Sequence, residues 1–343
     1  MRICSTATGS TRSTRRPLST STRSGRTVLR ALVIVVLLLA LFAAATLWRA
    51  ARREAQAEAE FPPEGQLIDV GGVQVHAVVM GQGPDLVLIH GSSGNTRDMT
   101  FSLAPRLAER YRVIVFDRPG LGYTDSLNDT GETLSQQVDL LTRAAAQLGA
   151  DRPIVMGQSL GGAVALAWAV EHPQALSALV LVSAPSHEWP GGLGGYYSAL
   201  SHPVWGPVVA TLITAWVPQS YVKSEIESVF APQSAPKGYA DRIGAGLTLR
   251  RASLLANARQ RAILKPQIVE MSRHYDRIAV PVESLHGTAD DTVYIDIHSE
   301  RLARDFPDRV HFTPLPGIGH MPHHVAEDAV VAAIDRAAER AED

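Results

Sequence analysis

The chain has 343 residues, of which 45% are apolar, and a formal net charge of −2. This length suits one large domain or two small ones and leaves room for a sizeable core. The near-neutral charge gives no overall attraction to nucleic acid, so we expect no nucleic-acid partner. The one cysteine, Cys4, excludes an internal disulfide and a metal site built from several cysteines.

The N-terminal segment, residues 1–30, carries seven arginines and no acidic residue. Serine, threonine, arginine and glycine dominate it, and apolar residues show no periodicity. Such a composition cannot bury a core, so we predict a disordered basic tail over this segment.

An uncharged, almost wholly apolar run of 18 residues follows at 31–48. It reaches the length of a transmembrane helix, which predicts a membrane partner. The alternative is a cleaved signal peptide, whose apolar region usually spans about 7–15 residues. Ala43-Ala44-Ala45 offers a small-residue cleavage site, so this alternative stays open. A linker over residues 49–65 begins as a charged helical extension and is interrupted by Pro62-Pro63.

The flanking charges predict how this segment crosses a membrane. Seven arginines precede the apolar run, and three follow it closely. Under the positive-inside rule, the N-terminus is cytoplasmic and the large domain lies outside, in the periplasm or the extracellular space. If the segment is a cleaved signal, the protein is secreted instead.

The remainder, residues 66–343, alternates short apolar runs with helical patterns. We expect strands at 67–70, 73–79, 86–89, 113–116, 153–157, 179–182, 281–286 and 310–313, and helices at 100–109, 133–148, 299–305 and 326–341. Continuous apolar runs are typical of strands that are buried on both faces of a parallel sheet. The alternation therefore predicts an α/β fold with a mostly parallel sheet of about eight strands flanked by helices.

The alternation stops between about residues 185 and 277, a stretch rich in glycine, proline and aromatic residues. Helical patterns at 196–201, 204–216, 220–230 and 236–260 predict an inserted helical cap. Residues 204–217 are apolar enough to suggest a second membrane span. They contain Pro207 and are too short, so we expect a buried cap helix, with interfacial membrane contact as the alternative.

Within the α/β pattern, Gly157-Gln158-Ser159-Leu160-Gly161 lies between an apolar strand and a helical pattern. This G-x-S-x-G spacing is typical of a nucleophile elbow, in which a sharp turn exposes a serine hydroxyl at the end of a strand. Glycines on either side of Ser159 allow the strand and helix to approach closely. A glycine-rich turn that merely contains a serine is the alternative.

Two later loops supply partners for Ser159. Asp290 and Asp291 follow the strand at 281–286, and either can provide a carboxylate. His320 follows the last strand in a Gly-Ile-Gly-His loop and can act as the base. His323 and His324 are rivals to His320, although their position after Pro322 suggests the start of a helix. The order Ser, Asp, His is that of the α/β-hydrolases.

Other histidines and one carboxylate lie near the predicted strand ends. We expect His90 and His286 to shape loops rather than to transfer protons. Asp117 fits a structural loop residue, and His298 and His311 fit ordinary surface or sheet positions.

The chain resembles the α/β-hydrolase superfamily, in particular its serine esterases and lipases, from about Gln66 to the C-terminus. The resemblance rests on His90-Gly91-Ser92, Asp117-Arg118-Pro119-Gly120-Leu121-Gly122, Gly157-Gln158-Ser159-Leu160-Gly161-Gly162, Gly287-Thr288-Ala289-Asp290-Asp291-Thr292-Val293 and Gly317-Ile318-Gly319-His320. The family's G-x-x-D-x-x-V pattern implies that Asp290, not Asp291, is the triad acid. It also implies an oxyanion hole from the backbone N–H groups of Leu160 and Ser92, with Ser93 as the alternative, and no metal or organic cofactor.

The resemblance also narrows the chemistry. Relatives that cleave carbon–halogen bonds or epoxides typically carry a carboxylate at the elbow, whereas this chain has Ser159. We therefore expect hydrolysis of a carboxylic ester, small or apolar, through an acyl-enzyme. The alternatives are hydrolysis of an amide, thioester or carbon–carbon bond, cofactor-free perhydrolysis, and a non-catalytic binding protein on the same fold.

Overall fold

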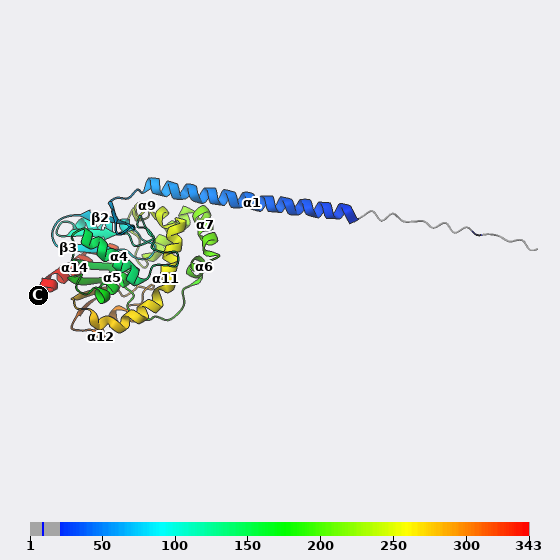
Figure 1. Ribbon diagram of the computed structural model, residues 1–343. Coiled ribbons are helices and arrows are strands. Elements are labelled where there is room, and N and C mark those ends of the chain that lie inside the picture. Colours follow the sequence, from blue (N-terminus) through cyan, green and yellow to red (C-terminus); the bar gives the residue numbers. More distant parts are fainter. Residues whose placement is uncertain (1–8, 10–20, 343) are drawn as a thin grey trace, which may run out of the picture. The chain divides into compact units, whose positions relative to one another are not determined.

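The structure is a computed structural model that describes residue 9 and residues 21–342. It divides into two compact units, Met1–Thr46 and Leu47–Asp343. Helix α1 (Ser21–Glu60) runs across this division (Figure 1). Most of the predicted tail lies outside the described residues. Residues 21–30 are helical, so the prediction of disorder was wrong for them, because each residue added to an existing helix gains a hydrogen bond.

The apolar run within α1 is solvent-exposed in its own unit. Among the described residues, this is the one helix long and apolar enough to cross a membrane, and none of its most apolar 18-residue window is buried. A core helix of a soluble protein would be buried, so a membrane anchor and a signal sequence are the two interpretations that fit. The helix ends at Glu60, just before Pro62-Pro63, as predicted.

The second unit contains an eight-stranded sheet in the order β1-β2-β4-β3-β5-β6-β7-β8. The strands are β1 (Gln66–Asp69), β2 (Gln74–Met80), β3 (Asp85–Ile89), β4 (Arg112–Phe116), β5 (Ile154–Gln158), β6 (Ala178–Val182), β7 (Val282–Gly287) and β8 (Val310–Leu315). β1 and β2 form an antiparallel hairpin that pairs antiparallel with β4, and the other six strands are parallel. The predicted mostly parallel sheet is confirmed.

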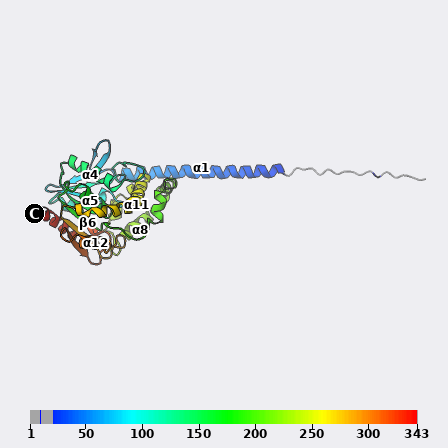
Figure 2. The ribbon, with the colours of Figure 1, turned by 60° about the horizontal axis from the view of Figure 1, so that its bottom comes forward.

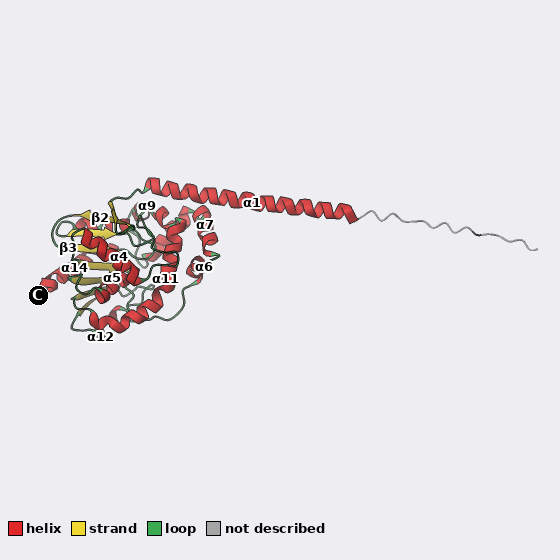
Figure 3. Cartoon of the chain, viewed as in Figure 1, coloured by secondary structure: helices red, strands yellow, loops and turns green. Residues whose placement is uncertain are grey.

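Helices cover both faces of this sheet (Figure 3). They are α2 (Thr96–Thr100), α3 (Leu103–Leu107), α4 (Leu134–Gln147), α5 (Leu160–Glu171), α12 (Ser299–Asp305), α13 (Pro322–Val325) and α14 (Glu327–Glu342). Val87 and Ile89 of β3 belong to one apolar cluster, with α4 and α5, while Leu86 and Leu88 belong to another, with α3 and α14. Successive side chains of a strand point to opposite faces, which explains the continuous apolar runs.

The single helix predicted at 100–109 is instead two short helices, α2 and α3, separated at Phe101 and Ser102. Pro105 lies in α3 and has no N–H to donate to the carbonyl of Phe101. A continuous helix would lose that hydrogen bond and bring the proline ring against this carbonyl, so the break falls there.

The cap lies between β6 and β7 and consists of helices that gather at one end of the sheet (Figures 1 and 2). They are α6 (Gly195–Ser201), α7 (Gly206–Trp216), α8 (Gln219–Val229), α9 (Tyr239–Arg242), α10 (Ala245–Thr248), α11 (Arg251–Met271) and the 3-10 helix η1 (Ser272–Arg277). The predicted helix at 236–260 was wrong, because α9, α10 and α11 replace it. Gly238 and Gly244, at φ 80° and 65°, adopt the left-handed conformation that interrupts it.

Helix α7 also differs from its prediction as a buried helix. Only Gly206, Ala210, Thr214 and Ala215 are buried. Val209 and Ile213 are partly buried against a cap cluster with Leu200 and Leu254, whereas Val208, Leu212 and Trp216 are exposed. The helix thus packs against the cap along one face and presents three large apolar residues outward.

Candidate active site

The elbow at Ser159 joins β5 to α5. Ser159 has φ 52° and ψ −125°, a conformation that non-glycine residues rarely adopt. A Cβ at Gly157 would collide with the backbone of Gly161, and one at Gly161 would collide with the carbonyl of Ile89. The two glycines are therefore required by the close approach of strand and helix, as the sequence pattern predicts.

Three of the predicted site residues form a chain of two hydrogen bonds with His320 in the middle. The Ser159 Oγ lies 3.0 Å from Nε2 of His320, and Nδ1 of His320 lies 2.8 Å from Oδ2 of Asp290. An ionised carboxylate only accepts hydrogen bonds, so Nδ1–H donates to Asp290 and Nε2 is left to accept from the Ser159 hydroxyl. All three side chains are buried.

Asp290 is ionised under ordinary conditions. Burial would raise the pKa of its carboxyl group, but hydrogen bonds from His286 and His320 hold the pKa below its usual value. The backbone N–H groups of Thr292 and Val293 also donate to Oδ1 at 2.9 Å. The side chain of Asp291 is exposed, so the geometry favours Asp290 of the two aspartates.

Two backbone N–H groups point to an oxyanion hole. Among the described residues, no hydrogen-bond acceptor is bound to the N–H of Ser92, which follows β3, or to that of Leu160, which begins α5. The N–H of Ser93 donates instead to Oδ1 of Asn257 at 2.9 Å. This bond occupies Ser93, so the geometry favours Ser92 over the alternative.

A cavity of about 240 Å³ opens at Ser159 and His320. Its other walls come from the loop after β3 and from the cap. The cap contributes Tyr197, Ile226, Val229, Phe230, Tyr239, Ile243 and Arg261. Most of these side chains are apolar or aromatic, so the cavity fits a small apolar group held against Ser159.

The predicted loop-shaping residues make structural hydrogen bonds. His90 accepts from the N–H of Arg118 at 3.1 Å, and burial, with the Arg118 charge, lowers its pKa to about 4. Asp117 accepts from the N–H groups of Thr96 and Tyr123 at 2.7 and 2.8 Å. These contacts order the loops that follow β3 and β4.

Two histidines near the site differ in their environments. His286 donates from Nε2 to the carbonyl of Val293 at 2.7 Å and lies 3.2 Å from Asp290. It thus shapes the aspartate loop, as predicted. His298, which we expected at a surface or sheet position, is buried, and burial lowers its pKa to about 3.

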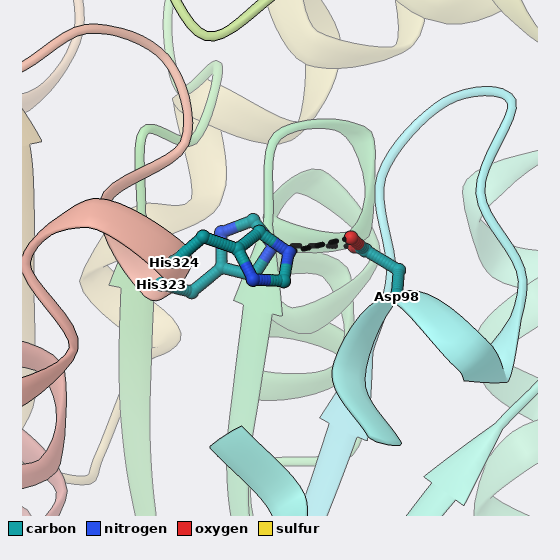
Figure 4. Close-up of side chains that lie close together, drawn as sticks. All are labelled: Asp98, His323 and His324. Atoms are coloured by element: carbon teal, nitrogen blue, oxygen red, sulfur yellow. Dashed lines mark hydrogen bonds and ion pairs between the residues drawn. The ribbon is translucent and has the colours of Figure 1, made fainter. Parts of the chain in front are cut away.

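A second buried group of side chains, the Asp98 cluster, consists of Asp98, His323, His324 and Tyr239. Asp98 lies on α2 and the histidines on α13, and their side chains point toward one another (Figure 4). Nε2 of His323 and of His324 lie 3.2 and 2.8 Å from the two carboxylate oxygens, and the Tyr239 hydroxyl donates to Oδ1 at 2.5 Å. The cluster ties the cap to the loop that carries His320.

Within the described residues, Asp98, His323 and His324 are also the group with spacing suited to a metal ion, since their ligand atoms lie within 4.8 Å of one another. However, Nδ1 of both histidines is buried without a hydrogen-bond partner. Histidines that bind metals normally donate this second nitrogen to a partner. The contacts therefore fit a hydrogen-bonded network better than a metal centre. His323 and His324 do not reach Ser159 in place of His320.

Sequence reasoning missed several residues at the site. Gln158, the variable position of the elbow, donates from Nε2 to the carbonyl of His320 at 3.1 Å. Asn257 bonds both the N–H and the hydroxyl of Ser93. Gln158 lies inside a recognisable motif, so its position was visible. Asn257 and the Asp98 cluster belong to no motif, and only the packing of distant segments brings them together.

Comparison with known proteins agrees with this arrangement. A model of the α/β hydrolase fold family matches residues 84–327. The dihydrolipoyllysine-residue acetyltransferase component of an acetoin cleaving system from Cupriavidus necator is 36% identical over 157 residues, 43% of this chain and 40% of that protein. A pimeloyl-(acyl-carrier protein) methyl ester esterase from Aeromonas hydrophila is 38% identical over 116 residues, 32% of this chain and 44% of that protein. The aligned segments span less than half of each relative.

Solved structures agree as well. The crystal structure of a membrane phospholipase A, described as a bacterial virulence factor, aligns with a TM-score of 0.63 at 21% identity, covering 90% of this chain and 98% of that one. At this identity the likeness concerns the fold alone. Since the family match extends over most of the sequence and the sheet order fits, the chain belongs to the α/β hydrolase fold family.

Proposed function

We propose that the protein is a serine hydrolase that cleaves a carboxylic ester through an acyl-enzyme intermediate. The observation that carries this proposal is the orientation of His320, whose Nε2 lies 3.0 Å from the Ser159 hydroxyl while Nδ1 is held by Asp290. A base whose free nitrogen accepts from a hydroxyl is the arrangement that activates serine.

The reaction follows from these contacts. His320 takes the Ser159 proton as Oγ attacks the ester carbonyl, and the N–H groups of Leu160 and Ser92 stabilise the oxyanion. The protonated His320 then gives its proton to the leaving alcohol. Water, deprotonated by His320, releases the acid and restores Ser159. An oxyanion donor of this kind is worth roughly 10²–10³ in rate.

The nature of the elbow residue and of the cavity supports an ester with a small or apolar acyl group. A serine at position 159 leads to an acyl-enzyme, whereas a carboxylate there would serve other displacements. In the cavity of about 240 Å³, the side chains that the cap contributes are apolar or aromatic apart from Arg261. One of the relatives is itself named an ester hydrolase.

We also propose that residues 31–48 anchor the protein in a membrane, with the N-terminus in the cytoplasm and the hydrolase unit outside. The exposed, uncharged run within α1 and the excess of arginines before it support this orientation. Complete extraction of the mature protein by high-salt washing would contradict the anchor. Protection of residues 63–343 from protease, in cells whose outer barrier is open, would contradict the orientation.

A fluorophosphonate probe tests the nucleophile. We expect labelling of the full chain in detergent and no labelling of the Ser159→Ala variant, with both proteins folded by circular dichroism. A panel of p-nitrophenyl esters of increasing acyl length, with matched amides and thioesters, then identifies the bond cleaved. Absence of labelling in the folded wild type would instead favour a binding protein on a hydrolase fold.

A further inference from the structure

Arg261 of α11 brings a positive charge to the wall of the substrate cavity. The cavity is shared with Ser159 and His320, and the other cap side chains that line it are apolar or aromatic. Asp98 also lines the cavity, but its carboxylate already accepts from histidines and from Tyr239. A charged group in such a cavity normally fixes the orientation of a ligand.

The guanidinium of Arg261 has no internal partner for its charge. Among the described residues it makes no hydrogen bond or ion pair, and its Nε is buried without an acceptor. By contrast, the neighbouring cap arginines Arg250 and Arg251 pair with Glu58 and Glu54 at 2.9 and 2.6 Å. Arg261 is thus left with unused N–H donors.

One aromatic contact holds Arg261 in place. Its guanidinium lies over the ring of Tyr197, 5.2 Å from the centroid. A contact of this kind takes no hydrogen bond from the guanidinium, so its N–H donors remain available to a ligand. A buried donor without an acceptor costs free energy, which an arriving anion would recover.

The position of Arg261 on α11 fixes how far an anion would lie from the reaction. Asn257, one helical turn earlier, bonds the N–H and the hydroxyl of Ser93 in the oxyanion loop. Side chains four residues apart share one helix face, with Cβ atoms about 5–6 Å apart. A group bound by Arg261 would therefore lie a short distance from the ester carbonyl.

We propose that Arg261 binds an anionic group of the substrate, so that the preferred ester carries a carboxylate or a phosphate a few atoms from the scissile bond. The proposal rests on the proposed serine hydrolase function and favours a small ester with an anionic group over a wholly apolar ester. Guanidinium groups bind both oxyanions through two parallel hydrogen bonds.

The test compares two esters with the same adipyl chain, mono-p-nitrophenyl adipate and methyl p-nitrophenyl adipate, in which a methyl group removes the negative charge. In the full chain in detergent, Arg261→Gln is expected to lower kcat/KM for the charged ester roughly 10- to 100-fold and to leave the neutral ester nearly unchanged. Arg261→Lys should retain part of the preference. Arg259→Gln, on the same helix but outside the cavity, serves as the matched control.

Equal losses for the two esters in Arg261→Gln, or no loss for either, would overturn the proposal. If wild type hydrolyses neither ester, fluorophosphonate labelling decides the proposed function, and ligand binding decides the role of Arg261. Calorimetry on Ser159→Ala with monomethyl adipate and with glycerol 3-phosphate should show binding that the added Arg261→Gln change abolishes. The ligand that binds with the lower Kd identifies the anion as a carboxylate or a phosphate. If neither ligand binds, the proposal for Arg261 is refuted.

Discussion

Two clusters of an aspartate and two histidines occur in this protein, and His320 of one lies only three residues before His323 of the other. In one, Asp290 lies within hydrogen-bond distance of His286 and His320. In the other, Asp98 accepts from His323 and His324. Both carboxyl groups have a lowered pKa, because bonds from histidine outweigh the effect of burial.

The clusters differ in the nitrogen that faces the carboxylate. His320 donates from Nδ1, so its Nε2 is free to accept from Ser159. His323 and His324 donate from Nε2, and their Nδ1 atoms are buried without a partner. An aspartate–histidine pair can thus activate a serine only when the histidine nitrogen that does not face the carboxylate accepts a hydrogen bond from the serine hydroxyl. Composition alone does not separate the proposed catalytic arrangement from the structural one.

Removing the nucleophile should give the largest effect. In Ser159→Ala, His320 keeps its bond to Asp290 but has no hydroxyl to deprotonate, so kcat/KM for p-nitrophenyl butyrate should fall about 10⁴-fold or more. The thermal midpoint should stay close to that of wild type. Retained turnover in the variant would mean that another residue is the nucleophile.

Exchanging each carboxylate for an amide tests the comparison directly. Asp290→Asn should lower kcat/KM roughly 10³- to 10⁴-fold, because the amide cannot hold His320 with Nε2 as the acceptor. Asp98→Asn should lower it by no more than about tenfold, since this cluster only positions the loop that carries His320. The two values come from steady-state kinetics on the same ester. Equal losses would show that the Asp98 cluster takes part in the chemistry.

The Asp98 cluster should matter more for stability. Asp98→Asn removes the charge that accepts from two histidines and Tyr239, so the free energy of unfolding should fall by roughly 1–3 kcal/mol. Tyr239→Phe removes one hydrogen bond and should cost about 1 kcal/mol. Urea unfolding of the detergent-solubilised chain measures both. If Tyr239→Phe lowered the free energy of unfolding more than Asp98→Asn did, the charge of Asp98 would not be the main source of the cluster's stability.

Acid should weaken the fold before it affects either carboxylate. Burial lowers the pKa of His90 and of His323 to about 4, against a usual value of 6.5. Below pH 6.5 these two histidines therefore bind protons in the unfolded chain but stay neutral in the native state. Stability should be complete above that pH and should decline down to about pH 4, by up to about 2 kcal/mol per group at pH 5.

Unfolding curves at pH 7.5, 6 and 5 test this decline. The slope with pH should become shallower in His323→Gln, because one of the groups that titrates differently in the two states is gone. A stability that stayed constant from pH 7.5 to 5 would mean that these histidines are protonated in the native state.

The sheet and the triad-like constellation were largely predictable from sequence. Apolar runs that are buried on both faces are typical of a parallel sheet. The glycines around Ser159 are needed because a Cβ at Gly157 or Gly161 would collide with nearby backbone. Asp290 and His320 follow strands, so topology alone brings them to one edge. The roles of these residues in catalysis remain predictions.

The cap was much less predictable. Helix α7 was expected to be buried and is buried on one face only, and residues 236–260 form parts of three helices instead of one. Cap helices pack on surfaces that the sheet provides, so their breaks depend on contacts with distant residues and not on local pattern. For the same reason, Asn257 and Arg261 could not be predicted from sequence. Asn257 bonds the distant Ser93, and the proposed partner of Arg261 is a substrate.

The exposed apolar face of α7 affects the solubility of the protein in preparations without its N-terminal segment. Trp205, Val208 and Leu212 lie on one side of this helix and remain exposed in the larger unit, which does not include the apolar run before residue 47. A preparation trimmed of its N-terminal segment would still display this stripe. We therefore expect such a preparation to self-associate in plain buffer and to become monodisperse in mild surfactant, as light scattering would reveal.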